Sequence, residues 1–294
     1  GWGISPDSSV SAIDQANTPF IDSLYENNPH ATLRTDGMDV GLPNGQMGNS
    51  EVGHVNLGAG RVVYQDLAKI NMAVDEDTLK DEPVLQKAFK TAKENKVKLH
   101  FIGLVSDGGV HAHINHIKGL VRAAKLAEVP DVYVHAFTDG RDVDPKSGAG
   151  FIKELQESCA ANNAQIASVV GRYYAMDRDK RWERVKKTYD LLVHGKGKST
   201  TDFVEAMKDS YANGTTDEFI EPLVGVGADN QPIATIQAGD VVVFFNFRTD
   251  RGRQLTQALH QQDFGDYDMK KQNLHFVTLT NYDDSFKGIQ VVFD

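Results

Sequence analysis

The sequence has one cysteine in 294 residues, Cys159, and no long hydrophobic run. A single cysteine cannot form an intrachain disulfide, so we expect a reduced, cytoplasmic protein in which Cys159 is a buried structural thiol. The longest purely apolar run spans only residues 241–245, whereas a membrane-spanning helix needs about 20 apolar residues. The sequence therefore predicts no contact with the membrane interior.

Positive charge is also scarce. The chain has 31 lysine and arginine residues against 41 aspartate and glutamate residues, which gives a formal net charge of −10. Proteins that bind nucleic acid or anionic membranes broadly are usually basic, so this balance argues against both partners. Seven arginines nevertheless fall in two short windows, residues 172–184 and 248–253, which indicates a local site for a small anion.

From residue 97 onward, short β-branched or apolar runs alternate with amphipathic stretches. This alternation predicts an α/β fold with a parallel sheet and crossover helices. The expected strands are residues 97–105, 132–137, 166–170, 241–245 and 274–279. The expected helices between them are residues 114–127, 151–161, 182–193 and 251–261.

The first 64 residues follow another pattern, with one expected helix at 18–25 and a glycine-rich and asparagine-rich segment at 41–60. No sheet could be built from this part alone. We therefore place a domain boundary near residues 63–66. Residues 1–64 are expected to belong to a domain whose remainder lies outside this sequence, and residues 65–294 to form a second, largely complete domain.

Charged loops follow four of the expected strands. In open parallel sheets, ligands bind beyond the carboxyl ends of the strands. The planar guanidinium of arginine can bond two oxygens of a phosphate or carboxylate at once. The residues after these strands thus predict a pocket for a doubly anionic molecule, although pairing of each arginine with a nearby carboxylate is the alternative. Helical positions make Arg181, Arg184 and Arg253 better candidates for surface or ion-pair residues.

Two other patterns are typical of ligand sites. His111, His113 and His116 could bind metal, because His-x-His follows a strand in binuclear metal hydrolases; such sites need further ligands, so we assign His111 to the anion pocket instead. Residues 195–200 are similar to the end of a phosphate-binding P-loop, but Leu192 replaces its first glycine and a helix precedes it. A nucleotide loop is therefore rejected.

Ser50 lies where the glycine-rich segment enters an expected helix. Free backbone N–H groups and the helix dipole attract phosphate at such a position. A serine there could act as a nucleophile, and metal activation is the simplest route because no Ser-His-Asp order is evident nearby. The alternative is that Ser50 merely caps the helix.

Five motifs together resemble the cofactor-independent (2,3-bisphosphoglycerate-independent) phosphoglycerate mutases. They are Gly-Leu-Pro-x-Gly-Gln-Met-Gly-Asn-Ser-Glu-Val-Gly-His, Ser-Asp-Gly-Gly-Val-His, Thr-Asp-Gly-Arg-Asp, Gly-Arg-Tyr-Tyr-x-Met-Asp-Arg-Asp and Asn-Phe-Arg-x-Asp-Arg, which lie at residues 41–54, 106–111, 138–142, 171–179 and 246–251. The resemblance implies a transferase domain inserted in an alkaline-phosphatase-like α/β domain. It also implies that the sequence lacks the extreme N-terminus and the C-terminal part of that second domain.

The resemblance implies roles for individual residues. Ser50 matches the nucleophile that receives the phosphoryl group and contacts a manganese ion, one of two in the complete family enzyme. The residues that match those holding phosphoglycerate are His111, Arg141, Asp142, Arg172, Arg178, Arg248 and Arg251. The implied protein is a cytoplasmic, monomeric isomerase of glycolysis and gluconeogenesis that interconverts 3-phosphoglycerate and 2-phosphoglycerate. Because the other metal ligands of the family are not in this sequence, metal binding and turnover by this chain stay open.

Two alternatives stay open as well. A metal-dependent phosphohydrolase of the same superfamily would share the nucleophilic serine, but arginines at four strand ends favour a closed anion pocket over one that admits water. A non-catalytic fragment that binds phosphoglycerate would need only the second domain.

Overall fold

The computed structural model describes residues 2–293. Within this range one sheet has the strand order β4-β5-β3-β2-β1-β6-β7-β8. The strands are β1 (Leu99–Val105), β2 (Val132–Thr138), β3 (Ala164–Gly171), β4 (Lys198–Thr200), β5 (Leu223–Gly225), β6 (Val241–Phe244), β7 (His275–Thr278) and β8 (Ile289–Val291). Neighbouring strands are parallel except β3 and β5, which are antiparallel. The predicted α/β fold with a mainly parallel sheet is confirmed.

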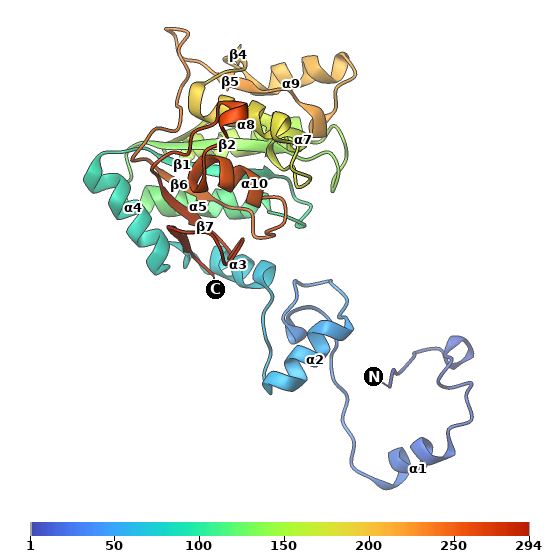
Figure 1. Ribbon diagram of the computed structural model, residues 1–294. Coiled ribbons are helices and arrows are strands. Elements are labelled where there is room, and N and C mark those ends of the chain that lie inside the picture. Colours follow the sequence, from blue (N-terminus) through green and yellow to red (C-terminus); the bar gives the residue numbers. More distant parts are fainter. Residues whose placement is uncertain (1, 294) are drawn as a thin grey trace.

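The helices are α1 (Pro19–Asn27), α2 (Ser50–Ala59), α3 (Asp66–Asp75), α4 (Pro83–Asn95), α5 (Ile114–Leu126), α6 (Gly148–Ala161), α7 (Arg172–Ala175), α8 (Trp182–His194), α9 (Phe203–Ala212) and α10 (Arg253–Thr256), with a π-helical turn, η5 (Gln257–Gln261). Helices α3 to α10 lie around or between these strands, whereas α1 and α2 belong to the N-terminal segment that extends away from the sheet (Figure 1). Every residue of β1 and β6 is buried, as is typical of central parallel strands covered on both faces. No helix within residues 2–293 combines the length and apolar character needed to cross a bilayer.

The structure differs from the sequence-based expectation in its short strands and in three helices, α3, α4 and α9, which were not predicted. The five expected strands are present with boundaries shifted by a few residues, but β4, β5 and β8 were not predicted. Each has three residues, too few to show an alternating pattern. The expected helix at 251–261 is instead α10 followed by the π-helical turn. It starts only after Gly252, where an added Cβ would lie 2.4 Å from the ring of Tyr282.

The reversed strand β5 brings the residues that precede it to the carboxyl ends of β2 and β3. The backbone carbonyl of Asp217 accepts a hydrogen bond from Thr138 Oγ1 (2.7 Å), and the carbonyl of Ile220 accepts one from the N–H of Gly171 (2.8 Å). The Asp217 carboxylate also accepts a hydrogen bond from the N–H of Gly148 at the start of α6 (2.7 Å). Segment 217–220 is thereby fixed against this edge of the sheet.

Residues 2–65 have a different character. The structure assigns them no strand, only an isolated bridge between Asp36 and Met47, and α1 buries none of its residues. Figure 1 shows this segment extending away from the sheet. Among the described residues, most large exposed apolar side chains lie here: Trp2, Ile4, Val10, Phe20, Leu24, Tyr25, Leu33, Met47, Val55 and Leu57. These features agree with a boundary near residue 65, which stays a prediction.

Limited trypsin digestion is expected to separate these two parts. Residues 2–65 contain two trypsin sites, Arg34 and Arg61, and both side chains are exposed. Protease needs a stretch of backbone that opens easily, and Arg34 lies in an exposed segment without helix or strand. We expect early cuts after both arginines and a resistant fragment that starts at Val62, identified by mass spectrometry. Equally fast cuts within the sheet domain would contradict the boundary.

Candidate functional site

The predicted anion pocket lies at the carboxyl ends of β3, β2, β1 and β6, which are neighbours in the sheet. The chain passes from β1 to β2 and β3 on one side and later places β6 on the other side of β1. Such a reversal of strand order is the usual place for a ligand in an open α/β sheet. The loops that follow these strands, beginning at Ser106, Asp139, Arg172 and Phe245, meet at this edge.

Arg172 occupies the interior of the site. Its side chain is 3% exposed, and its NH1 atom donates hydrogen bonds to Asp139 Oδ1 and Asp142 Oδ2, both at 2.6 Å. Burial alone would raise the pKa of Asp139, but hydrogen bonds from the Asp142 N–H and Ser106 and the charge of Arg172 hold this pKa below its usual range. Arg172 is therefore a buried, charge-paired side chain.

His111 lies between two carboxylates. Its Nε2 atom is 3.9 Å from Asp142 Oδ2, and its Nδ1 atom is 3.8 Å from Asp250 Oδ1. Burial, and next the nearby charge of Arg172, lower the pKa of His111 to about 4, so the ring is neutral at pH 7. Its Nδ1 atom is buried and has no hydrogen-bond partner within residues 2–293. A neutral ring with an unsatisfied nitrogen can still bond one ligand atom.

The other four arginines surround this centre. Arg178 NH1 and Arg248 Nε donate to the two oxygens of Asp250, at 2.9 Å and 3.1 Å. Arg251 NH1 donates to the carbonyl of Met176 (3.1 Å), and Arg141 NH1 donates to Glu218 Oε1 (3.4 Å). Burial lowers the pKa of Arg251, and so do the charges of its neighbours Arg172, Arg178 and Arg141.

The structure thus brings together the seven predicted substrate-binding residues. We call this group the arginine cluster: His111, Arg141, Asp142, Arg172, Arg178, Arg248 and Arg251. Sequence reasoning did not select Asp139, Asp250 or Ser106, although all three lie inside the charged motifs. An aspartate close to an arginine in the sequence is most simply interpreted as its ion-pair partner. A single sequence therefore does not predict that such an aspartate is buried at the centre of a site.

The remaining sequence candidates have structural partners. His113 accepts a hydrogen bond from the N–H of Asn115 at the start of α5, and His116 Nε2 bonds Asn71 Oδ1 (2.8 Å). Arg184 pairs with Asp177 (3.5 Å) and stacks over the ring of Tyr173, as expected of an ion-pair residue. The rejected P-loop segment begins at Gly195, which ends α8 in a left-handed conformation and leads into β4.

Ser50 is the first residue of α2, as predicted, but it does not cap the helix. The cap is Asn49, whose side chain accepts a hydrogen bond from the N–H of Val52 (3.0 Å). Ser50 is exposed, and its Oγ lies 3.2 Å from His54 Nδ1. That nitrogen is also 2.7 Å from the carbonyl of Ser50, which makes it a donor and leaves it no lone pair for the serine proton.

The local residues do not form a complete metal site around Ser50. Within residues 2–293 there is no group of three or more His, Cys, Asp or Glu side chains that could hold a metal ion. The structure also does not bring Ser50 into the arginine cluster, since α2 lies apart from the sheet (Figure 1). The side chains described around Ser50 therefore do not supply the set of ligands that a metal ion needs.

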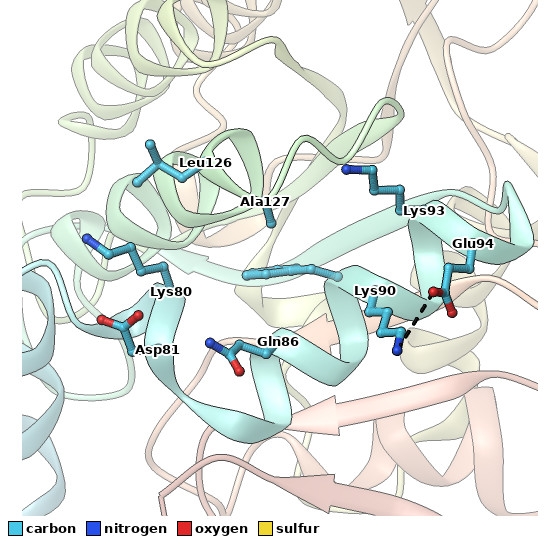
Figure 2. Close-up of a pocket in the computed structure, with 9 residues that line it drawn as sticks. Lys80, Asp81, Gln86, Lys90, Lys93, Glu94, Leu126 and Ala127 are labelled. Carbon is cyan, nitrogen blue, oxygen red and sulfur yellow. Dashed lines mark ion pairs between the residues drawn. The ribbon is translucent and has the colours of Figure 1, made fainter.

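A hollow of about 650 Å³ lies elsewhere, between α4 and the end of α5 (Figure 2). Three lysines border it, but each pairs with a carboxylate: Lys93 with Glu128 at 2.7 Å, Lys80 with Asp77 at 3.3 Å and Lys90 with Glu94 at 3.8 Å. None of the cluster residues lines this hollow. We assign it no function.

Replacing Arg248 by alanine is expected to change the free energy of unfolding by less than about 1 kcal/mol, because exposed ion pairs contribute little. The Arg248 side chain is 50% exposed, and its partner Asp250 keeps its hydrogen bond from Arg178. Urea unfolding of the variant and of the unaltered chain measures this difference. A loss above about 2 kcal/mol would show that Arg248 stabilises the fold and is not simply an exposed side chain available to bind a ligand.

Comparison with known proteins agrees with the motifs. The family described as "BPG-independent PGAM N-terminus (iPGM_N)" matches residues 70–284. The 2,3-bisphosphoglycerate-independent phosphoglycerate mutase of Flavobacterium psychrophilum is 61% identical over 294 residues, which are 100% of this chain and 58% of the relative. The protein with the same name from Parabacteroides distasonis is 52% identical over 295 residues, again 100% of this chain and 58% of the relative.

A solved structure supports the same relationship. The crystal structure of Leishmania mexicana phosphoglycerate mutase at low cobalt concentration has a TM-score of 0.75 and 33% sequence identity, and the match covers 97% of this chain and 54% of that one. This chain therefore spans a little over half the length of these relatives. Given a family match over residues 70–284 and motifs that converge on one edge of the sheet, the chain belongs to the BPG-independent phosphoglycerate mutase family, by its iPGM_N domain.

Proposed function

We propose that this chain supplies the phosphoglycerate-binding part of an isomerase that interconverts 3-phosphoglycerate and 2-phosphoglycerate in glycolysis and gluconeogenesis. The observation that supports this most is the arginine cluster, in which five arginines and a neutral histidine meet at one edge of the sheet. A phosphoglycerate carries a phosphate and a carboxylate, and each matches the paired donors of a guanidinium. The family relationship supports the same substrate.

In this proposal the cluster binds and orients the substrate. The exposed pairs of Arg178 and Arg248 with Asp250 would exchange that carboxylate for the anionic groups of the substrate. His111 would bond an oxygen through its unsatisfied Nδ1. Fixed cations also exclude free water from the bound phosphoryl group and hold it in line for transfer.

Phosphoryl transfer itself is assigned to Ser50. Its Oγ would form a bond to phosphorus while the bond between phosphorus and the first glycerate oxygen breaks, and the proton that Ser50 loses would be balanced by protonation of that glycerate oxygen. The reverse step on the other hydroxyl of glycerate would release the isomer. A phosphoserine intermediate allows this exchange without a second phosphorylated cofactor.

Enzymes of this family are metal-dependent. We propose Mn²⁺ as the ion that would lower the proton affinity of the Ser50 hydroxyl. Ser50 is the residue of this chain offered as a ligand, and it has no further set of ligands around it within residues 2–293. The proposed substrate binding does not depend on the metal.

Binding of phosphoglycerate without turnover is the second candidate. The observation in its favour is that Ser50 is exposed beside a histidine nitrogen that already donates to a carbonyl. A phosphohydrolase is less well supported, because the cluster would keep water from the phosphoryl group.

Replacing Ser50 by alanine is expected to abolish interconversion in any form of the protein that catalyses it, because the phosphoryl group then has no covalent acceptor. From the 294-residue chain alone we expect little turnover even without the substitution, because the side chains described around Ser50 do not supply a full set of metal ligands. A coupled assay with added Mn²⁺ measures interconversion, and phosphate release measures hydrolysis. Ser8→Ala, another exposed serine of the N-terminal part, is the matched control.

The outcomes separate the candidates. Calorimetric binding of 3-phosphoglycerate without turnover supports the binding role of this chain. Strong Mn²⁺-dependent interconversion by this chain, lost with Ser50→Ala but not with Ser8→Ala, would contradict the expectation of little turnover. Phosphate release without interconversion would favour the hydrolase, and absence of any phosphoglycerate binding would refute the proposed substrate.

A further inference from the structure

Asp139 is a buried carboxylate that joins the ends of three adjacent strands. Val105, Thr138 and Gly171 are register partners at the last positions of β1, β2 and β3. The next residues, Ser106, Asp139 and Arg172, therefore lie side by side. Asp139 is 1% exposed; its Oδ2 accepts a hydrogen bond from Ser106 Oγ (2.7 Å), and its Oδ1 accepts one from Arg172 NH1 (2.6 Å).

The same carboxylate shapes the loop that follows β2. Its Oδ1 also accepts hydrogen bonds from the backbone N–H groups of Arg141 (3.2 Å) and Asp142 (3.0 Å). The loop turns through Gly140, which has φ +66° and whose added Cβ would lie 2.8 Å from Asp217 Cβ. Three members of the arginine cluster, Arg141, Asp142 and Arg172, are thus held directly by Asp139.

The hydrogen-bond count indicates that Asp139 positions other groups and does not bind substrate. A carboxylate has about four acceptor positions, and Asp139 receives four donors from the protein. It is buried and negative, so it offers nothing to an anionic ligand.

Arg172 shows what this arrangement achieves. Its NH1 carries two hydrogens, and both go to carboxylates, one to Asp139 and one to Asp142. Within residues 2–293 its Nε and NH2 atoms donate no hydrogen bond. The parallel donors Nε and NH2 on the other edge of this buried guanidinium are therefore without a protein acceptor among residues 2–293, which suits them to bond a phosphate or carboxylate.

We propose that Asp139 is a positioning residue for the phosphoglycerate site. It fixes NH1 of Arg172 together with the backbone of Arg141 and Asp142, so that the free edge of Arg172 meets the ligand without rearrangement. The inference rests on the proposed function of the chain, because it concerns the same site.

The test is calorimetric titration of the chain with 3-phosphoglycerate, combined with thermal unfolding. Asp139→Ala removes the two oxygens that accept these four hydrogen bonds and is expected to raise Kd about 10–100-fold, the size of effect seen when the partner that orients a metal ligand is lost. Asp139→Asn keeps the shape and one acceptor oxygen but removes the negative charge that faces Arg172, so we expect a rise of about threefold to tenfold. If the alanine variant does not fold, the asparagine variant decides.

Asp240→Asn is the matched control. Asp240 is also buried (4% exposed) and accepts hydrogen bonds from two backbone N–H groups, those of Lys98 (3.1 Å) and Gln237 (2.8 Å), and from His100. It precedes β6 and so lies at the opposite end of the strand from the arginine cluster. We expect this control to lower Tm while Kd stays within about twofold of the unaltered chain.

A double variant shows whether Asp139 acts through Arg172. In an Arg172→Lys background the planar fork is absent, so Asp139→Asn is expected to change Kd by less than about twofold. Full additivity of the two substitutions would overturn the inference, and so would a folded Asp139→Asn variant with unchanged Kd. If the unaltered chain fails to bind 3-phosphoglycerate, the proposed function and this inference fail together, whereas the previous outcomes refute the inference alone.

Discussion

Replacing Arg172 by alanine is expected to lower the free energy of unfolding by about 3–5 kcal/mol, because it leaves buried charges unpaired. Asp139 is 1% exposed and Asp142 is largely buried, and both lose a 2.6 Å bond to NH1. Binding of phosphoglycerate is expected to become unmeasurable, since Arg172 is the central cation of the arginine cluster. Urea unfolding and calorimetric titration measure the two effects.

Arg122→Ala is the control for this prediction. Arg122 pairs with Asp77 at 2.7 Å, but both side chains are exposed by 40% or more. Loss of an exposed ion pair should cost less than about 1 kcal/mol. If Arg172→Ala also costs less than about 1 kcal/mol, Arg172 is not the buried clamp that its surroundings indicate.

Acidification is expected to produce the second large effect. Burial, and next the charge of His113, lower the pKa of His116 to about 3; burial and next Arg172 lower the pKa of His111 to about 4. Both pKa values lie below the value of about 6.5 in the unfolded chain. Between pH 6.5 and the folded-state pKa of each ring, the unfolded chain therefore binds more protons than the folded chain. The stability from these neutral rings is complete above about pH 6.5 and is lost as the pH falls towards 3–4.

The expected size is several kcal/mol. One unit of pKa difference corresponds to about 1.4 kcal/mol, so each ring contributes on the order of 3 kcal/mol or more. Below about pH 4, protonation of Asp139 adds to the loss, because its pKa is held below its ordinary value in the folded state and the unfolded chain takes up the proton first. Urea midpoints measured from pH 7.5 to 4.5 follow the change.

His116→Asn is expected to make this pH dependence shallower, because one buried titrating ring is removed. His30→Asn is the control, since His30 is exposed in the N-terminal part. An unchanged slope in the His116 variant would mean that the ring is not kept neutral by burial. A similar change of slope in the His30 variant would show that exposed histidines account for it.

The long strands of this fold and most of the helices between them could be predicted from the sequence, whereas the three-residue strands and the helices α3, α4 and α9 were not predicted. The run 241–244 is entirely apolar and 99–105 is apolar except for His100 and Gly103, as expected of strands that are covered on both faces. β5 has three residues, and its direction is set by pairing with β3 rather than by its own side chains. A property that depends on a partner far along the chain leaves no local pattern.

The site shows the same division. The arginines stand out in the sequence because their type and their position after strands suit an anion. Arg172 and Arg248 look alike in the sequence, yet the first is 3% exposed and the second is 50% exposed. The difference arises because Arg172 directly follows a buried strand between two carboxylates, whereas Arg248 lies in the loop beyond β6. Burial is a property of the assembled sheet, so one sequence cannot assign it residue by residue.

Strand β5 is antiparallel to β3, and this direction determines which residues can vary around the arginine cluster. A strand parallel to β3 places the residues that follow it at the edge of the sheet that holds the arginine cluster. The antiparallel β5 instead places there the residues that precede it, so Asp217 and Glu218 lie near Arg141. Residues 213–216 link the end of α9 to Asp217. Insertions or deletions in residues 213–216 are therefore expected to move Glu218 and its partner Arg141, and under the proposed function to alter ligand preference, while the contacts of Arg172 with Asp139 and Asp142 stay in place.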